Sequence, residues 1–286
     1  MNIFFYWDNP ANFPNAYSNN IKTAEAIHYD ANIELIDAEK AKRICKEFHT
    51  ETGIFIDLDI INIPAAKSDI VRLMALYLYG GWYLDCDLQI KRHLAYLSNN
   101  QDFVMFHRKD KFGGYWHTNM AFYLTKKHEL ALDVLKFIDR CFQTETLMYD
   151  VWSCTGPGAI TAYTNLYGIT KDNTLDFNEY FSGTGCVFKS IDSNTGTSWK
   201  YQQAFGILEG MPYNQFAMPK DPKHCNRLIG FLKNRKDKDI ILMLKSHGEL
   251  FITNKQFSNY VEELVSVGNE DLKSAAASLI QKVSLP

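Results

Sequence analysis

Two aspartates, Asp85 and Asp87, are the residues whose type and spacing most clearly predict chemistry in this chain. They stand two positions apart at the end of a predicted strand, so their side chains project to the same side. Two neighbouring carboxylates repel each other and resist burial. A hard divalent cation relieves that repulsion and keeps coordination positions open for diphosphate oxygens. The pair therefore predicts a metal site that binds a diphosphate.

The spacing alone is not specific, because Asp57 and Asp59 form a second D-x-D pair. Context separates the two pairs. Only Asp85 and Asp87 follow an apolar helix, a Gly80-Gly81 break and an aromatic strand. We therefore expect Asp57 and Asp59 to lie in a loop or at a strand edge, without a role in the site.

The segment before the functional pair carries a longer pattern. Ser68-Asp69-x-x-Arg72 opens it, an apolar helix follows, and it ends in Tyr79-Gly80-Gly81-Trp82-Tyr83-Leu84-Asp85-Cys86-Asp87. This pattern resembles the D-x-D region of glycosyltransferase family 32. That family includes yeast-type mannosyltransferases, bacterial capsule and lipopolysaccharide sugar transferases, and relatives of the clostridial glucosylating toxins. The close match covers residues 65–88, with weaker matches at Phe5-Tyr6-Trp7, Asn119 and Thr155-Gly156-Pro157-Gly158.

The resemblance implies an α/β fold of the GT-A type, which binds nucleotide sugars. It would be a single Rossmann-like domain over residues 1–286, with a mixed sheet and C-terminal helices. Residues 1–125 would mainly bind the nucleotide sugar and the metal, and residues 126–286 would mainly form the acceptor side and the C-terminal helices. The implied reaction is a retaining hexosyl transfer that depends on Mn²⁺ or Mg²⁺. The donor would be a nucleotide sugar, most often a UDP-sugar in bacterial members, and the acceptor a saccharide or glycolipid.

The motif also implies roles for individual residues. Asp87 would ligate the metal directly, and Asp85 would bind the ribose or a metal-bound water. Asp69 and Arg72 would hold hydroxyl groups of the donor sugar. Asn119 would touch the donor sugar near the reacting carbon.

Further roles follow from the weaker matches. Trp7, beside Tyr6 in the donor site, would stack on uracil, and Tyr83 would help to close the uridine site. Relatives place a metal-binding histidine or acidic residue late in the chain, often near a Ser-x-Trp. Here His247 follows Ser246 but no tryptophan comes after it. His247 is the candidate third metal ligand, with Glu249 as the alternative.

Hydrophobic periodicity places these residues on alternating strands and helices. It predicts strands at residues 3–7, 33–36, 54–61, 82–90, 104–107, 121–124 and 240–246. It predicts helices at residues 22–28, 37–48, 65–79, 129–142, 156–167, 254–266 and 270–283, with Asp37 as an N-cap. This alternation favours one α/β domain.

Composition narrows the class of protein. The chain has 286 residues, a formal net charge of −3 and 22% charged residues, which argues against a nucleic-acid partner. Its six cysteines are scattered without C-x-x-C spacing, as expected for reduced thiols in a cytoplasmic protein. No window predicts a signal peptide or a membrane span.

The last predicted helix leaves a choice of partners open. It carries an apolar stripe formed by Leu272, Ala276, Leu279 and Val283. Packing on the core is the favoured interpretation. Dimerisation and contact with the inner face of a membrane that bears a lipid-linked acceptor are the alternatives. The oligomeric state is left open.

Three other functions compete with surface-polysaccharide or lipopolysaccharide synthesis. A toxin-like enzyme would modify a protein, but the chain lacks the long helical additions of such toxins. A D-x-D phosphohydrolase would need Thr or Val two residues beyond its second aspartate, where this chain has Gln89 after Asp87 and Ile61 after Asp59. A non-catalytic sugar-nucleotide-binding protein would not need the intact pair. Turnover would separate the last alternative from an enzyme.

Overall fold

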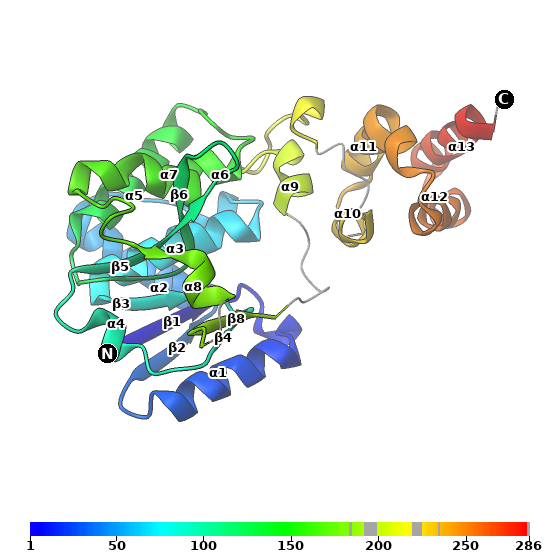
Figure 1. Cartoon of the computed structure of the whole chain (residues 1–286). Helices are drawn as coiled ribbons and strands as arrows, with labels where there is room; N and C mark the ends of the chain where they lie inside the picture. The colour runs from blue at the N-terminus through cyan, green and yellow to red at the C-terminus, as the bar shows by residue number, and fades with distance from the viewer. Residues whose placement is uncertain (183–184, 192–198, 219–224, 234, 285–286) are drawn as a thin grey trace. The chain divides into compact units, whose positions relative to one another are not determined.

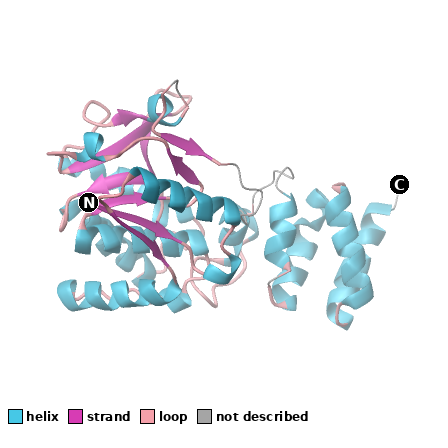
Figure 2. Ribbon diagram, turned by 90° about the horizontal axis from the view of Figure 1, so that it is seen from below, coloured by secondary structure: helices cyan, strands magenta, loops and turns pink. Residues whose placement is uncertain are grey.

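The computed structural model describes residues 1–182, 185–191, 199–218, 225–233 and 235–284 (Figure 1). The chain divides into two compact units, each with its own internal packing. The first comprises Met1–Leu147 and Val151–Asn194, and the second comprises Met148–Asp150 and Thr195–Pro286. Strands occur in the first unit, while helices dominate the second (Figure 2).

A mixed six-stranded sheet organises the first unit, in the order β2-β1-β3-β6-β5-β7. β1 is parallel to β2 and β3, β6 is antiparallel to β3 and β5, and β7 is parallel to β5. β4 and β8 form a separate antiparallel pair. The strands are β1 (Asn2–Tyr6), β2 (Asn32–Ile36), β3 (Gly81–Leu84), β4 (Leu88–Ile90), β5 (Phe103–Lys109), β6 (Tyr115–Leu124), β7 (Leu175–Asp176) and β8 (Phe188–Ser190).

Helices connect and cover these strands (Figure 1). In the first unit they are α1 (Asn15–Ile27), α2 (Ala38–Thr52), α3 (Pro64–Tyr79), α4 (Ala95–Ser98), α5 (Glu129–Gln143), α6 (Val151–Cys154), α7 (Pro157–Thr164) and α8 (Phe177–Phe181). The helices of the second unit are α9 (Trp199–Gln202), α10 (Cys225–Leu232), α11 (Asp237–Phe251), α12 (Lys255–Val267) and α13 (Glu270–Ser284). Short 3₁₀ turns occur at Pro10–Asn12, Leu58–Ile60, Asn165–Tyr167, Gln203–Phe205 and Gln215–Ala217.

Alternation along the strands divides the core of the first unit between the two faces of the sheet. Ile3 and Phe5 of β1 join a buried cluster that also holds residues of α1 and α8. Phe4 of β1 is equally buried and its ring lies 6.0 Å from that of Tyr79 at the end of α3. α3 is therefore buried against the face opposite to α1 and α8, which fixes the position of its polar residues.

The turn from α3 into β3 depends on two glycines. Gly80 has φ +67° and Gly81 φ +122°, a region that favours glycine. A Cβ on Gly81 would lie 2.4 Å from the carbonyl oxygen of Asn2, so no side chain fits between the strands here. The helix stop predicted at these residues is confirmed, and the tight turn leads directly into β3, which ends one residue before Asp85.

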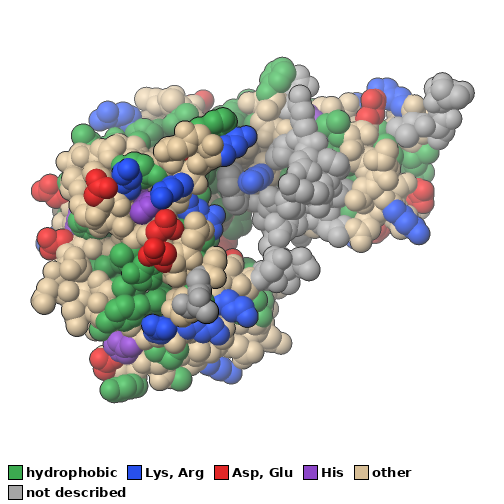
Figure 3. Space-filling view, viewed as in Figure 1, with side chains coloured by type: hydrophobic (Ala, Val, Ile, Leu, Met, Phe, Trp, Pro, Cys, Tyr) green, Lys and Arg blue, Asp and Glu red, His purple; other side chains and the backbone are tan. Residues whose placement is uncertain are grey.

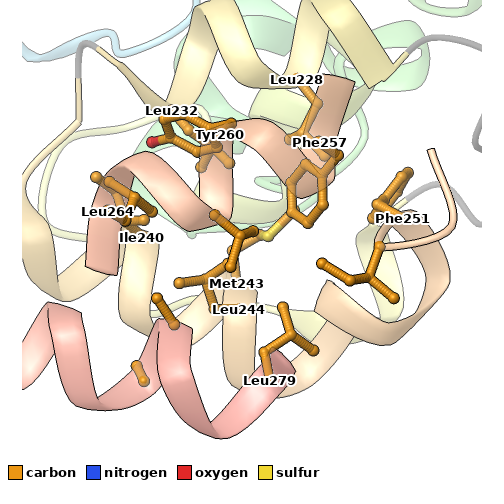
Figure 4. Packing of buried hydrophobic residues seen from close by; sticks show 14 of the residues in the cluster. Leu228, Leu232, Ile240, Met243, Leu244, Phe251, Phe257, Tyr260, Leu264 and Leu279 are labelled. Atoms are coloured by element: carbon orange, nitrogen blue, oxygen red, sulfur yellow. The ribbon is translucent and has the colours of Figure 1, made fainter. Parts of the chain in front are cut away.

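The second unit has a helical core of its own. Side chains from α10, α11, α12 and α13 point toward one another, with Met243 of α11 among them (Figure 4). Leu272, Ala276 and Leu279 of α13 are buried in this cluster, so packing on the core, the favoured interpretation of that stripe, is confirmed for them. The side chain of Val283 lies outside the described residues.

Most predicted elements are confirmed, including the N-cap at Asp37, whose carboxylate accepts a hydrogen bond from the Lys40 amide at 2.8 Å. Two predicted strands are wrong, and a third, at residues 82–90, is interrupted at residues 85–87 by the turn between β3 and β4. Residues 54–61 form a loop and a 3₁₀ turn, because the Asp57 side chain accepts from the Asp59 amide and competes with strand pairing. Residues 240–246 lie inside α11, since a short apolar run does not distinguish a strand from a buried helix.

Other predictions have a partial answer. The α/β class with a mixed sheet and C-terminal helices is confirmed. That residues 1–286 act as one domain stays a prediction, because compact packing units do not by themselves define a functional domain.

Among the described helices, none is both long and apolar enough to cross a bilayer. Lys and Arg side chains on the face in Figure 3 are dispersed among other side chains.

His117 of β6 makes stability depend on pH. Its ring is fully buried, Nδ1 lies 3.1 Å from the Thr164 hydroxyl of α7, and Nε2 has no hydrogen-bond partner among the described residues. Burial lowers its pKa to about 4. Because the folded state holds the ring neutral, it loses stability as pH falls below the unfolded value of about 6.5. We expect this residue to remove up to about 3 kcal/mol between pH 6.5 and pH 4.

Urea denaturation at several pH values checks this expectation. His117→Asn should flatten the decline in the free energy of unfolding over that window. The matched control is His49→Asn, which changes an exposed histidine and should leave the decline as in the wild type. The same slope in both variants would contradict the assignment.

Candidate functional site

The D-x-D pair lies in the turn between β3 and β4. The Asp85 amide donates to the Met120 carbonyl of β6 at 2.7 Å, and the Leu88 amide donates to the Asp85 carbonyl at 3.0 Å. Cys86, between the two aspartates, is buried, and its Sγ lies 3.3 Å from the carbonyl oxygen of Tyr6 at the end of β1. The turn is thus fixed at the carboxyl edge of two adjacent parallel strands, where α/β sheets bind their ligands.

Asp87 carries an unsatisfied buried oxygen. Its Oδ1 has no hydrogen-bond partner among the described residues. Burial, followed by the neighbouring charge of Asp85, raises the pKa of Asp87 to about 7. A buried carboxylate oxygen without a donor is costly, and a bound cation removes that cost. The residues present therefore fit the divalent metal that the motif implies.

Arg72 of α3 links the D-x-D turn to the helix. Its Nη2 lies 3.3 Å from Oδ1 of Asp85 and 3.1 Å from Oδ1 of Asp69. Its Nε donates to the Ser68 carbonyl at 3.1 Å, and its Nη1 donates to the carbonyl of Asn119. The guanidinium is buried, so these contacts hold it in one orientation.

Asp69 is the second centre of the network and is also buried. Oδ1 accepts from the side-chain Nδ2 of Asn119 at 2.7 Å, and Oδ2 accepts from the Thr155 hydroxyl at 3.0 Å. Burial raises the pKa of Asp69 to about 7, and the positive charge of Arg72 opposes that shift. Every contact to this side chain comes from a donor, so the surroundings are arranged for a carboxylate.

Tyr83 of β3 packs against the guanidinium group of Arg72. The guanidinium carbon lies 4.2 Å from the centre of the Tyr83 ring, and the Tyr83 hydroxyl lies 2.8 Å from that of Ser68. The side chain is only 1% exposed. These contacts position Arg72 and Ser68, while direct contact of Tyr83 with uridine stays a prediction.

The end of β1 brings Tyr6 and Trp7 to the same edge of the sheet. The Tyr6 hydroxyl donates to Asp8 at 2.8 Å. The Trp7 ring is half-buried and packs edge-on against Phe13 at 5.6 Å and Tyr17 at 5.5 Å. The structure therefore brings the first strand to the D-x-D turn, and stacking of Trp7 on uracil stays a prediction.

A comparison with known protein families gives a match for the part of the chain that contains this site. Residues 14–104 match the family model described as the glycosyltransferase sugar-binding region containing the DXD motif. The matched range includes Asp69, Arg72, Asp85 and Asp87. Over these residues the chain resembles D-x-D glycosyltransferases. A search of curated proteins gives no match.

Solved structures that resemble this chain are similar only at a distance. The PaToxG glycosyltransferase is 17% identical over 60% of this chain and 71% of its own, with a TM-score of 0.44. The galactosyltransferase LgtC, solved with donor and acceptor sugar analogues, is 19% identical over 63% and 74%, with a TM-score of 0.38. The catalytic domain of alpha-toxin from Clostridium novyi is 10% identical over 58% and 63%, with a TM-score of 0.35. The resemblance to glycosyltransferases accordingly rests on the family match over residues 14–104.

The predicted late metal ligand, His247, lies in the second unit. His247 is on α11, not after a strand, and its Nδ1 lies 3.0 Å from the Tyr213 hydroxyl. Glu249 pairs with Lys282 at 2.9 Å on the surface. The described residues contain no group of three or more His, Cys, Asp or Glu arranged around a common point. A metal role for His247 or Glu249 stays a prediction.

The second D-x-D pair has a structural role. Asp57 caps the 3₁₀ turn at Leu58–Ile60, and Asp59 pairs with Lys42 at 2.9 Å. Asp59 is largely exposed, in contrast to Asp69. The expectation of a loop position is confirmed, and the residue serves as a matched control for the site.

Sequence reasoning missed two residues of the network, Ser68 and Thr155. Both stood in quoted motifs, Ser-Asp-x-x-Arg and Thr-Gly-Pro-Gly, without a role. Thr155 is fully buried and precedes α7, so only the fold brings it to Asp69, 86 positions earlier in the chain. Motif membership was the one signal that pointed to them.

Replacing Asp69 tests the buried network. Asp69→Asn leaves the buried Arg72 charge poorly balanced and turns an amide nitrogen toward donor groups. Breaking a buried ion pair on one side typically costs about 3 kcal/mol or more. We expect that loss in the free energy of unfolding, measured by urea denaturation. Asp59→Asn removes an exposed pair and should cost at most about 1 kcal/mol. Equal stability of the two variants would contradict a structural charge network around Arg72.

Proposed function

We propose that this glycosyltransferase moves a hexose from a nucleotide sugar, with UDP as the preferred nucleotide, to a hydroxyl group of a saccharide or glycolipid acceptor. The observation that carries this proposal is the unsatisfied Oδ1 of Asp87 beside Asp85, inside the family-matched region. The described residues provide donors for Asp69 and Asp85 but none for this oxygen. We infer that a metal and the donor diphosphate complete the site.

Asp85 and Asp87 would hold the metal, Mn²⁺ or Mg²⁺. When bound, such an ion neutralises charge that develops on the departing nucleotide diphosphate. Mg²⁺ sites of this kind use one or two carboxylates and leave other positions to substrate phosphates and water. His247 is our candidate for a third protein ligand.

Asp69 would orient the donor sugar. A carboxylate offers about four acceptor sites. Oδ1 accepts from both Asn119 and Arg72, whereas Oδ2 accepts from a single donor among the described residues, the Thr155 hydroxyl. Oδ2 therefore retains capacity to accept a sugar hydroxyl without losing a contact of the network. Asn119 and Arg72 would hold the carboxylate in place during that contact.

The transfer itself would retain the anomeric configuration. The bond between the sugar carbon and the phosphate oxygen breaks, and its electron pair goes to the leaving diphosphate. The acceptor hydroxyl oxygen forms its bond to the same carbon from the same face, and its proton passes to the leaving phosphate oxygen. We assign no residue of the network as a covalent nucleophile. The role of the network is to hold the sugar and exclude other orientations.

The proposed setting is the assembly of surface polysaccharide or lipopolysaccharide in the cytoplasm. A lipid-linked acceptor would bring the enzyme to the inner face of the membrane. Five described cysteines form no disulfide, which supports a reducing compartment: Cys45, Cys86, Cys141, Cys154 and Cys186. This setting follows from the family resemblance and from the thiols alone.

Replacing Asp87 tests the proposed activity. Asp87→Ala should reduce Mn²⁺-dependent hydrolysis or transfer from a panel of nucleotide sugars by at least about 100-fold, because the metal loses its direct ligand. EDTA should abolish the wild-type activity, and added Mn²⁺ should restore it. Asp59→Ala, in the other D-x-D pair, should keep wild-type activity. Full activity of Asp87→Ala, or full activity in EDTA, would remove the proposal.

The same variant should be more stable than the wild type without metal. Removing a buried oxygen that lacks a partner relieves about 1–3 kcal/mol of desolvation cost. Thermal denaturation in EDTA should therefore show a raised Tm for Asp87→Ala. Mn²⁺ should raise the Tm of the wild type and leave that of the variant unchanged. A variant that is less stable in EDTA would show that Asp87 is a structural residue.

A further inference from the structure

The second unit contains a pocket that the proposed reaction does not use. Its volume is about 600 Å³, within the range of about 300–1,000 Å³ that is typical of small-molecule sites. The residues that define its character are three aromatic side chains and three from one helix: Tyr149, Tyr213, Phe216, Leu242, Lys245 and Ser246. All of them belong to the second unit, so the pocket is complete within it.

Hydrogen bonds hold two of the aromatic rings in place. The Tyr149 hydroxyl donates to the Pro212 carbonyl at 2.6 Å. The Tyr213 hydroxyl lies 3.0 Å from both the Ser246 hydroxyl and His247 Nδ1. These rings are half-buried, and their fixed orientation lowers the entropy cost of packing a ligand against them.

Phe216 is placed differently, because its side chain is 89% exposed. It stands on the 3₁₀ turn Gln215–Ala217, where the Asn214 side chain accepts from the Phe216 amide at 3.0 Å. The Asn214 amide in turn donates to the Ala204 carbonyl at 2.8 Å. The turn is therefore anchored while the ring remains exposed at the pocket. Such an aromatic side chain contributes little to the core and is free to contact a ligand.

α11 supplies the polar wall. Leu242, Lys245 and Ser246 are spaced i, i+3 and i+4 and share one face of the helix. The opposite face, with Met243 and Leu244, is buried in the core (Figure 4). Lys245 is exposed and makes no ion pair among the described residues. The wall thus presents a hydroxyl group and an ammonium group beside aromatic rings.

We propose that this pocket binds a saccharide, as a subsite of the second unit for the acceptor. A sugar ring has apolar C–H faces that pack on aromatic rings and hydroxyl groups at its edge that exchange hydrogen bonds. Fixed tyrosine rings, an exposed phenylalanine, hydroxyls and one ammonium match both surfaces of such a ring. A nucleotide would need several donors for its phosphates, and this wall has one cation. That the saccharide is the acceptor rests on the proposed function.

Binding of free saccharides tests the pocket directly. Full-length protein is titrated, in EDTA and without nucleotide sugar, with glucose, galactose, N-acetylglucosamine, glucuronic acid and their disaccharides, and binding is followed by saturation-transfer NMR. At least one saccharide should bind. Phe216→Ala should weaken that binding at least tenfold, because it removes the exposed ring without disturbing the core. Phe112→Ala, which removes an 84% exposed ring from the first unit, should bind as the wild type does.

Ser246→Ala is the second variant, since it removes a hydroxyl and keeps the helix. It should also weaken saccharide binding. Lys245→Gln should weaken the binding of glucuronic acid more than the binding of glucose. The proposal is overturned if no saccharide of the panel binds, if Phe216→Ala binds as tightly as Phe112→Ala, or if UDP competes for the same ring. Donor hydrolysis is measured without saccharide, and saccharide binding without metal or donor. Failure of the Asp87 experiment and failure of this one are therefore distinguishable.

Discussion

The buried ion pair between Arg72 and Asp69 is the interaction on which the site depends. Neither charge is stable in the interior alone. Arg72 also contacts Ser68 on its own helix, and the remaining contacts of the pair join other elements. Asn119 comes from β6, Thr155 precedes α7, and Asp85 follows β3. α3, the central strands and α7 must therefore all be in place before the charges are satisfied. The site and the fold of the first unit are formed by the same contacts.

The topology of the sheet explains why the D-x-D turn lies where it does. β1 and β3 run parallel and end at one edge, and β6 runs antiparallel beside β3 and extends past that edge. The Met120 carbonyl accepts from the Asp85 amide, which anchors the turn to β6. Because β6 continues beside the turn, Asn119 reaches Asp69 on α3. In a purely parallel sheet the neighbouring strand would end at the same edge, and no strand residue would lie where Asn119 does.

The sequence predicts the local part of this arrangement well. Four site residues lie within 19 consecutive positions: Asp69, Arg72, Asp85 and Asp87. Helix periodicity places the first two on α3, and the Gly80-Gly81 break predicts where the chain turns toward the other two. Thr155 was not predicted, because nothing local to a Thr-Gly-Pro-Gly stretch indicates which carboxylate it meets. The strand predicted at residues 240–246 failed for a related reason. Its apolar run faces a core made by α12 and α13, and only tertiary contacts reveal the helical period.

One side chain stands apart in the first unit. Asp69 and Asp85 receive donors from the protein, while Asp87 Oδ1 is buried and receives none from the described residues. The fold tolerates that cost because the Arg72 network, only two residues away at Asp85, holds the turn rigid against the escape of Asp87 to solvent. Local rules of folding predict a satisfied or exposed carboxylate at this position. An unsatisfied oxygen beside the Asp85 carboxylate is what a cation site requires, and core packing alone does not explain it.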